Sequence, residues 1–333
     1  MDPITQGALG ISAAQSCSRP KQLAWAGLFG LLGGLAPDLD VLIRSDTDPL
    51  LFLMYHRQFS HSLIFIPLGG LLLGLLLHVL FGRRQGFSLP QTVLFTTLGY
   101  ATHALLDACT TYGTQLLWPF SEQRFAWNNM SIIDPLYSLV VIGLVVTAAL
   151  KKKPWLARLA LAWVVAYPLA GAWQRERVEA EAWQLVKQRG HQPIRLEAKP
   201  SFANLWVWKV VYETDQRFYV DAIRMTTSAL IYEGDSLEKL DVERDFPWLD
   251  KDSQQAKDIE RFRWFSNGYI AKDPDRPNHI IDVRYSMVPN EIEALWGIQV
   301  RPTAALSEHS VYVVERSASR RHRQALTDML LGR

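Results

Sequence analysis

Residues 62–81 read SLIFIPLGGLLLGLLLHVLF, and this stretch decides what kind of protein the chain encodes. Its only ionisable residue is His78, close to its end. An apolar stretch of about 20 residues is long enough to cross the hydrocarbon core of a bilayer as a helix. The sequence therefore predicts a membrane-spanning helix here.

Four more stretches in the first half of the chain have the same character to differing degrees. Residues 132–150 and 155–173 are as apolar as the first stretch. Residues 90–109 are less apolar because they contain His103 and Asp107, and residues 23–36 are short because they end at Pro37. Residues 3–17 are apolar and rich in small side chains, which predicts a short or re-entrant N-terminal helix. We expect five spans, with this N-terminal helix as a candidate sixth.

Basic residues between the spans predict the orientation of the helices. They form three clusters: Arg19 with Lys21, Arg83 with Arg84, and Lys151 to Lys153. If the spans alternate in direction, all three clusters lie on one side of the membrane, and the excess of Lys and Arg marks the cytoplasmic side. The loops 38–61 and 110–131 then face outward, together with everything after residue 173.

The second half of the chain is more polar and predicts an α+β soluble domain. Residues 174–189 are typical of a charged helix, and 204–224 alternate like a β-hairpin with a turn at Thr214, Asp215 and Gln216. Further strands are expected at 228–233, 279–288 and 309–315, and further helices at 251–265 and 318–331. The predicted fold class is an all-α polytopic membrane bundle at 1–173, followed by an α+β domain at 174–333 that faces the periplasm.

Composition excludes several classes of protein. Lys plus Arg is 35 and Asp plus Glu is 33 in 333 residues, which leaves a net charge of +2 and no gross basic surface for nucleic acid. The two cysteines, Cys17 and Cys109, exclude a disulfide scaffold and a zinc site built on thiolates. Several of the 12 tryptophans, Trp118 among them, flank the predicted spans, where membrane proteins place interfacial anchors.

Seven polar residues of the first half fall at the outward ends of different predicted helices. They are Asp38, Asp40, His56, His61, His103, Asp107 and Asp134. Ionisable groups at membrane depth are costly and usually functional. Since the orientation was inferred from Lys and Arg alone, this gathering of His and Asp on one side is an independent observation.

The spacing within the group indicates a metal site. His103 and Asp107 are four residues apart, so both project from one helical face and can bind one ion. His56 and His61 are five apart, which suits a loop ligand followed by one at a helix start, with Ser60 as an N-cap. Imidazole and carboxylate ligands suit a divalent ion: zinc first, with manganese or iron as alternatives.

Each residue taken alone has a plainer interpretation. Asp38 and Asp40 fit a loop that ends a helix, Asp134 fits an N-cap before Pro135, and His103 fits a buried hydrogen-bonded histidine. His78 belongs to this plainer class, because it lies at the opposite end of its span. The convergence of the whole set on one side favours a metal site.

Several longer strings resemble the YdjM-like family of membrane-bound, metal-dependent hydrolases of bacterial inner membranes. They are MDPITQGALG, APDLD, HRQFSHS, HALLDACTTYGTQLLWPFS and FAWNNMSIIDPLY, and they lie within roughly residues 1–175. The family is distantly similar to zinc-dependent phospholipase C and P1-type nucleases. The resemblance implies an inner-membrane location and implies His56, His61, His103, Asp107 and the Asp38/Asp40 pair as metal ligands, with Asp134 as a further candidate. Many family members have His where this chain has Gln6.

Two classes of function are open at this stage. The first is a metallohydrolase that cleaves a phosphate ester of a lipid or lipid-linked molecule. In it Asp40 or Asp107 serves as the base, Arg57 holds a phosphate oxygen, and Thr111 and Gln115 support the site. The second is a non-catalytic scaffold or transporter with a structural metal or a proton relay. Transporters usually place ionisable groups near the bilayer midplane, whereas these lie near one surface, which favours the hydrolase. Membrane lipids are the expected partners.

Overall fold

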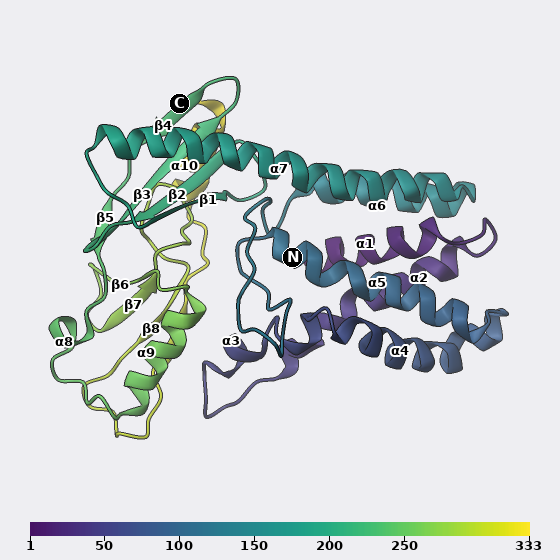
Figure 1. The fold of residues 1–333 in the computed structure, drawn as a ribbon, viewed down its shortest axis with the longest axis horizontal. Coiled ribbons are helices and arrows are strands. Elements are labelled where there is room, and N and C mark those ends of the chain that lie inside the picture. The colour runs from purple at the N-terminus through teal and green to yellow at the C-terminus, as the bar shows by residue number, and fades with distance from the viewer. The chain divides into compact units, whose positions relative to one another are not determined.

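The structure, a computed structural model, describes all 333 residues and divides into two units (Figure 1). The first, the helical unit, comprises residues 1–42, 55–173 and 202–204. The second, the sheet unit, comprises residues 43–54, 174–201 and 205–333. The chain passes from the first unit to the second within one long helix, between Trp173 and Gln174.

The helical unit is built from antiparallel helices that lie side by side (Figure 1). The long ones are α1 (Pro3–Ser16), α2 (Leu23–Leu35), α4 (Phe65–Leu77), α5 (Leu89–Cys109), α6 (Pro135–Lys151) and the first part of α7 (Pro154–Gln188). Short helical turns are η1 (Ala36–Leu42), α3 (Leu51–Tyr55), η2 (Phe59–His61), η3 (His78–Gly82) and η4 (Arg83–Gln85).

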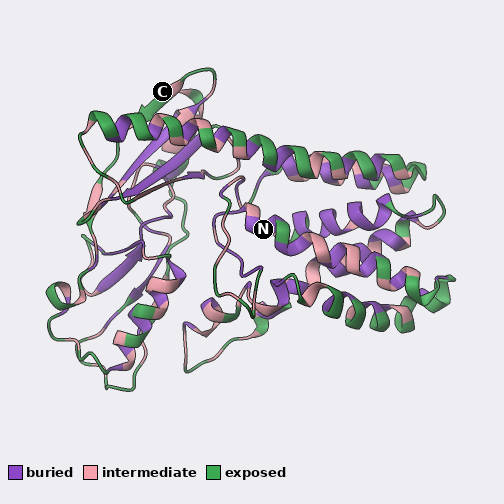
Figure 2. Ribbon diagram, viewed as in Figure 1, coloured by how far each residue is buried: buried purple, intermediate pink, exposed green.

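Three helical stretches are long and apolar enough to cross a membrane: Leu23–Leu42, Phe65–Gln85 and Pro154–Gln188. The α6 helix is apolar but has only 17 residues, and α5 has 21 residues but carries His103 and Asp107. The expected count of five spans therefore stays a prediction. In Figure 2, α4 is exposed along most of its length while α1 is largely buried, so apolar side chains of α4 face outward.

Local chemistry explains where several of these helices begin. Asp2 accepts a hydrogen bond from the backbone N of Thr5 at 3.0 Å and caps α1. Ser88 and Gln91 form a reciprocal capping box at the start of α5, which satisfies backbone donors that the helix itself leaves unpaired. Asp134 caps α6 by accepting a hydrogen bond from the backbone N of Tyr137, and a proline follows it in the first turn.

Glycines bring α1, α2 and α5 into backbone contact. A Cβ atom built on Gly30 of α2 would lie 2.2 Å from the carbonyl oxygen of Gly10 in α1. A Cβ on Gly99 of α5 would lie 2.1 Å from the carbonyl oxygen of Gly30. Small residues at helix crossings allow such close approach, which is how membrane helices commonly pack. Gly30 is therefore the point at which three helices meet.

The two ends of the helical unit differ in charge. The turns that join α1 to α2, α4 to α5 and α6 to α7 lie together at one end and carry the three basic clusters (Figure 1). The N-terminus, η1, η2 and the last residues of α5 lie at the other end. This second end holds the predicted metal ligands.

The sheet unit contains two antiparallel sheets and three further helices. The first sheet has the order β1-β2-β3-β4, with β5 also paired to β3, and the second has the order β6-β7-β8-β9. The strands are β1 (Arg195–Pro200), β2 (Val207–Glu213), β3 (Arg217–Met225), β4 (Ala229–Tyr232), β5 (Ser236–Glu238), β6 (Ile270–Lys272), β7 (His279–Asp282), β8 (Trp296–Gln299) and β9 (Val311–Val314). The helices are α8 (Val242–Asp245), α9 (Gln254–Phe265) and α10 (Arg320–Leu331).

Side chains from helix and sheet form the core of this unit. Val178 and Ala182 of α7 pack on Trp208 and Tyr212 of β2. A second cluster of apolar side chains joins the two sheets. Lys209 of β2 is buried, and its Nζ donates to Ser286 Oγ and to the carbonyl of Glu291 at 2.8 Å each. Burial lowers the pKa of Lys209 to about 7. The two hydrogen bonds explain why a lysine is tolerated there.

The predicted hairpin is confirmed, since β2 pairs with β3 in antiparallel register with Tyr212 opposite Tyr219. The helices expected at 251–265 and 318–331 are present as α9 and α10. The charged helix expected at 174–189 is confirmed as the last part of α7, whose 35 residues run without a break from Pro154 to Gln188. The strands expected at 228–233, 279–288 and 309–315 are present in part as β4, β7 and β9, whereas β1, β5, β6 and β8 were not predicted.

The glycine crossing leads to a testable prediction. Gly30→Leu should destabilise the helical unit by about 1–3 kcal/mol or more, because α1 and α5 must move away from α2 to admit the side chain. The measurement is thermal unfolding of the detergent-purified protein. Gly143→Leu is the matched control, because nothing lies within 4 Å of a Cβ at that exposed position of α6. Equal melting temperatures for the two variants would contradict the close crossing.

Candidate metal centre

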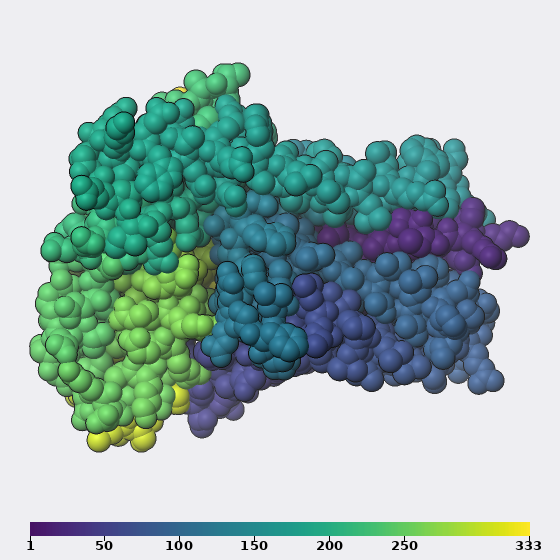
Figure 3. Space-filling model, viewed as in Figure 1, coloured from purple at the N-terminus to yellow at the C-terminus, as the bar shows by residue number.

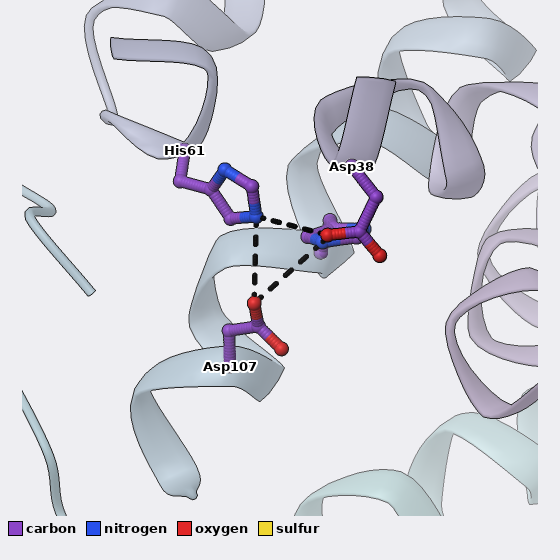
Figure 4. Close-up of side chains that lie close together, drawn as sticks. Asp38, His61 and Asp107 are labelled. Atoms are coloured by element: carbon purple, nitrogen blue, oxygen red, sulfur yellow. Dashed lines mark ion pairs between the residues drawn. The ribbon is translucent and has the colours of Figure 1, made fainter. Parts of the chain in front are cut away.

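Four side chains that can bind metal converge at the acidic end of the helical unit. They are Asp38 from η1, His61 from η2, and His103 and Asp107 from α5. One ligand atom of each lies within 4.8 Å of those of the other three. Figure 4 shows Asp38, His61 and Asp107 facing one another, with their ion pairs dashed. We call this group the primary cluster.

The four His–Asp distances within the primary cluster are close to those around one tetrahedral ion. Nε2 of His61 lies 3.5 Å from Oδ1 of Asp38 and 3.4 Å from Oδ2 of Asp107. Nε2 of His103 lies 3.3 Å and 3.7 Å from the same two oxygens. Four atoms bound tetrahedrally at about 2.0–2.1 Å are separated from one another by about 3.3–3.4 Å. The four atoms therefore already stand at close to the spacing that a zinc-like ion requires.

Both histidines are held so that Nε2 faces the centre. Nδ1 of His103 hydrogen-bonds the backbone carbonyl of Gly34 at 2.5 Å. A carbonyl only accepts, so Nδ1 carries the hydrogen, and in the neutral ring Nε2 presents a lone pair. Nδ1 of His61 lies 3.0 Å from Oγ of Ser60 and 3.1 Å from Oδ2 of Asp40. Such outer contacts orient ligating histidines in metal proteins.

Three atoms of the primary cluster lack a hydrogen bond although they are buried. They are Nε2 of His61, Nε2 of His103 and Oδ2 of Asp107, whose residues are all 0% exposed. Burying polar atoms without partners is costly. Oδ2 of Asp107 has an ion-pair partner in Arg57, but the two histidine nitrogens have none outside the cluster. A divalent ion would supply the missing partner to both nitrogens at once, so the residues present fit a metal ion.

Acidic neighbours change the proton affinity of His61. Burial lowers its pKa, but contacts with Asp107, Asp38 and Asp40 outweigh burial and raise the pKa of His61 to about 10. A proton and a metal ion compete for the same nitrogen, so binding of an ion here releases a proton.

A second group, formed by Asp38, Asp40 and His56, shares one carboxylate with the primary cluster. Oδ1 of Asp40 lies 2.8 Å from Nδ1 of His56, and its Oδ2 accepts from Ser60 Oγ at 2.8 Å. Asp40 also lies near Nδ1 of His61, so it links the two histidines of this segment. Asp40 supports the primary cluster from outside, and the second group is a further position at which an ion could be held.

Arg57 is held between the two groups. Its Nε forms an ion pair with Oδ2 of Asp107 at 2.9 Å, and its Nη1 donates to Oγ1 of Thr110 at 3.2 Å. Its guanidinium lies 4.7 Å from the ring centre of Tyr112. The backbone at Arg57 has a φ of 63°, which is unfavourable for a residue with a side chain. Two hydrogen bonds hold the backbone there: the N of Arg57 donates to Oδ2 of Asp40, and the O of Arg57 accepts from the N of Gln115.

The segment after α5 turns back over this end of the unit. Gly113 has a φ of 92°, as expected for a turn that needs a glycine. Gln115 and Thr111 are both buried, and the backbone N of Gln115 donates to the carbonyl of Arg57 at 3.0 Å. Direct hydrogen bonds from these two side chains to a ligand or substrate stay a prediction.

Asp134 lies outside both groups. Its Oδ1 accepts from the backbone N of Tyr137 at 3.2 Å, and its Oδ2 accepts from the hydroxyl of Tyr167 at 2.7 Å. The structure therefore places it in the plainer role of a helix cap. His78 also follows its plainer interpretation, because its Nδ1 contacts Oγ1 of Thr92 at the basic end.

Sequence reasoning did not assign two groups that contact Asp107. The side-chain amide of Gln6 donates to Oδ1 of Asp107 at 2.9 Å, and the amino group of Met1 forms a buried ion pair with the same oxygen. The helix α1 also carries Thr5, Ser12, Gln15 and Ser16, so its pattern does not single out Gln6. The available signal was the departure of Gln6 from the family pattern.

The first half of the chain matches a known protein family. The model of the YdjM inner membrane protein family matches residues 1–178. The chain belongs to this family. The match covers the whole primary cluster and ends shortly after α7 leaves the helical unit.

Two curated proteins are similar to this member of the YdjM family. Uncharacterized protein YfhP of Bacillus subtilis is 22% identical over 191 residues, which cover 57% of this chain and 56% of that protein. Inner membrane protein YbcI of Escherichia coli is 36% identical over 112 residues, which cover 32% of this chain and 58% of that protein. The matches thus span a little over half the length of these relatives. No solved structure matches the chain.

The geometry predicts metal binding that depends on His103. Wild-type protein purified in detergent should retain a divalent ion, and His103→Ala should weaken its binding by about 100-fold or more, because one of four ligands is removed. Elemental analysis and titration with zinc would measure this. His78→Ala is the control, since that histidine lies at the basic end. Equal metal content in all three proteins would exclude the primary cluster as the site.

Proposed function

We propose that this YdjM-family protein is a metal-dependent hydrolase that cleaves a phosphate ester of a lipid or lipid-linked molecule at the outer face of the inner membrane. The observation that carries the proposal is the primary cluster: buried His and Asp ligand atoms 3.3–3.7 Å apart, with Nε2 of His61 and Nε2 of His103 lacking any hydrogen bond. Two imidazoles with two carboxylates fit zinc best, and manganese or iron would also be accepted.

If an ion held by the four residues of the primary cluster took a water as a fifth ligand, it would lower the pKa of that water and polarise a phosphoryl oxygen. The chain's own residues supply the rest of the chemistry. Asp40 orients His56, whose side chain is 18% exposed and stands next to the cluster as a proton acceptor. Asp107 is occupied as a ligand and by Arg57, so the role of base passes from Asp107 to the Asp40–His56 pair.

Arg57 is placed to contact a phosphate. A guanidinium carries five N–H donors in a planar fork that matches phosphate oxygens. Two of its nitrogens are engaged, by Asp107 and by Thr110. Its remaining donors are those that a phosphate bound at the cluster would use.

The alternative is a scaffold or transporter with a structural metal. It is favoured by the extent to which the charged groups already pair with one another, as Arg57 does with Asp107 and Asp40 does with His56. Turnover distinguishes the two functions, because a structural site needs the ion but has no substrate.

The proposal predicts hydrolysis that depends on the metal. Protein shown to hold metal should release phosphate or a phosphorylated head group from at least one member of a panel of lipid phosphates, and chelation should abolish the activity. His61→Ala should remove it because the ligand, and with it the activated water, is lost. His78→Ala should retain it. Unchanged turnover in His61→Ala would exclude catalysis at this cluster, and silence across the panel would favour the scaffold.

The location of the site at the outer face rests on the basic turns at the opposite end of the helical unit. A reporter that is active only in the periplasm, fused after the last residue, should therefore be active. A reporter that folds only in the cytoplasm should be silent at the same position. The reverse result would place the metal centre on the cytoplasmic side.

A further inference from the structure

A short apolar turn projects from the loop that follows α5. It consists of Leu117, Trp118, Pro119 and Phe120, and the backbone N of Phe120 closes it by donating to the carbonyl of Leu117 at 2.9 Å. Phe120 is 81% exposed and Leu117 is 44% exposed. Figure 3 shows the loop, in dark teal, at the surface of the helical unit. An aromatic side chain held this far out at the tip of a turn has no packing role within the unit.

The turn is fixed to the segment that carries His61. The backbone N of Leu63 donates to the carbonyl of Leu116 at 2.9 Å, and Gln115 is bonded to Arg57. The ring of Trp118 packs against Phe59 with 6.2 Å between ring centres, and Phe59 is part of η2 together with His61. The turn therefore packs on the same short helix, η2, that carries the candidate metal ligand His61.

The exposed apolar surface continues from the turn onto α4. Leu63 and Ile64 are 41% and 52% exposed. The hydrogen bond from Leu63 to the carbonyl of Leu116 places them next to the turn. They lead directly into the exposed leucines of α4, which belongs to the most apolar of the candidate spans. We call the surface formed by Leu63, Ile64, Leu117 and Phe120 the apolar rim. It carries no charge, and the next ionisable residue along the loop is Glu122.

We propose that the apolar rim inserts into the lipid leaflet beside the metal centre and that the apolar chain of the substrate lies along it. Continuity with α4 identifies lipid as the occupant, because the bilayer that covers the span must reach the rim at its end. Aromatic side chains at the ends of spans are typical of this depth. The second half rests on the proposed function: the chain of a lipid substrate stays among the rim residues while its phosphate enters the cluster.

Insertion is tested without any turnover. Phe120→Cys is made in a Cys17→Ser, Cys109→Ala background, labelled with a polarity-sensitive dye, and reconstituted into vesicles of phosphatidylethanolamine and phosphatidylglycerol. We expect blue-shifted emission that is quenched by spin-labelled lipid. Gln123→Cys, three residues further along the same loop and also exposed, is the matched control and should be quenched by aqueous iodide instead.

Two results would overturn insertion. A label at position 120 that is quenched by iodide as strongly as the label at position 123 would place the turn in water. A label that neither quencher reaches would mean that protein, such as a second copy of the chain, covers the rim.

The substrate half is tested with two variants and two chain lengths. Phe120→Asp should raise KM for a long-chain lipid phosphate about tenfold or more, because an apolar contact is replaced by a charge, and Phe120→Leu should restore it. The effect should shrink as the chain is shortened, and metal content should not change. An equal rise in KM for all chain lengths would overturn the contact. If no lipid phosphate is cleaved at all, the proposed function fails while the insertion result stands by itself.

Discussion

Asp107 carries a carboxylate in the interior of an apolar helical unit, and the rest of the site is arranged around that charge. A buried carboxylate without partners is so costly that it would not persist. Its two oxygens are surrounded by donors and ligand atoms from three separate parts of the chain. These are the amino group of Met1, Gln6, Arg57, His61 and His103. Each of them is itself buried, so the removal of one would leave the others unbalanced.

Such an arrangement requires helices that approach one another closely. Gln6 reaches Asp107 because α1 lies against α5, and Asp38 reaches His103 because α2 lies against α5. Both contacts depend on glycines such as Gly30, whose backbone is touched from two sides. Larger side chains at the crossing would separate the helices by more than a metal–ligand bond can span. The small residues in the middle of the helices thus set the geometry at their ends.

The position of the site explains how a polar centre and an apolar rim can be neighbours. The ligands lie at helix ends, so charged groups and exposed apolar side chains are a few residues apart. His61 and Leu63 illustrate this, since one faces the cluster and the other is exposed beside α4. In the proposed arrangement the bilayer would supply the apolar side, which a soluble protein would have to build from its own fold.

The sequence by itself determined everything that depends on local periodicity and short spacing. Long apolar runs predicted membrane helices, alternation predicted the β2–β3 hairpin, and the separation of four residues placed His103 and Asp107 on one face. It also predicted the primary cluster, because its residues fell at one end of alternating spans. Only the tertiary structure decided which acidic residues join it. Asp134 satisfies its charge as a helix cap and Asp40 by orienting two histidines, whereas Gln6 enters through a helix crossing. Local pattern cannot reveal these choices, because partners distant in sequence meet only when the helices pack.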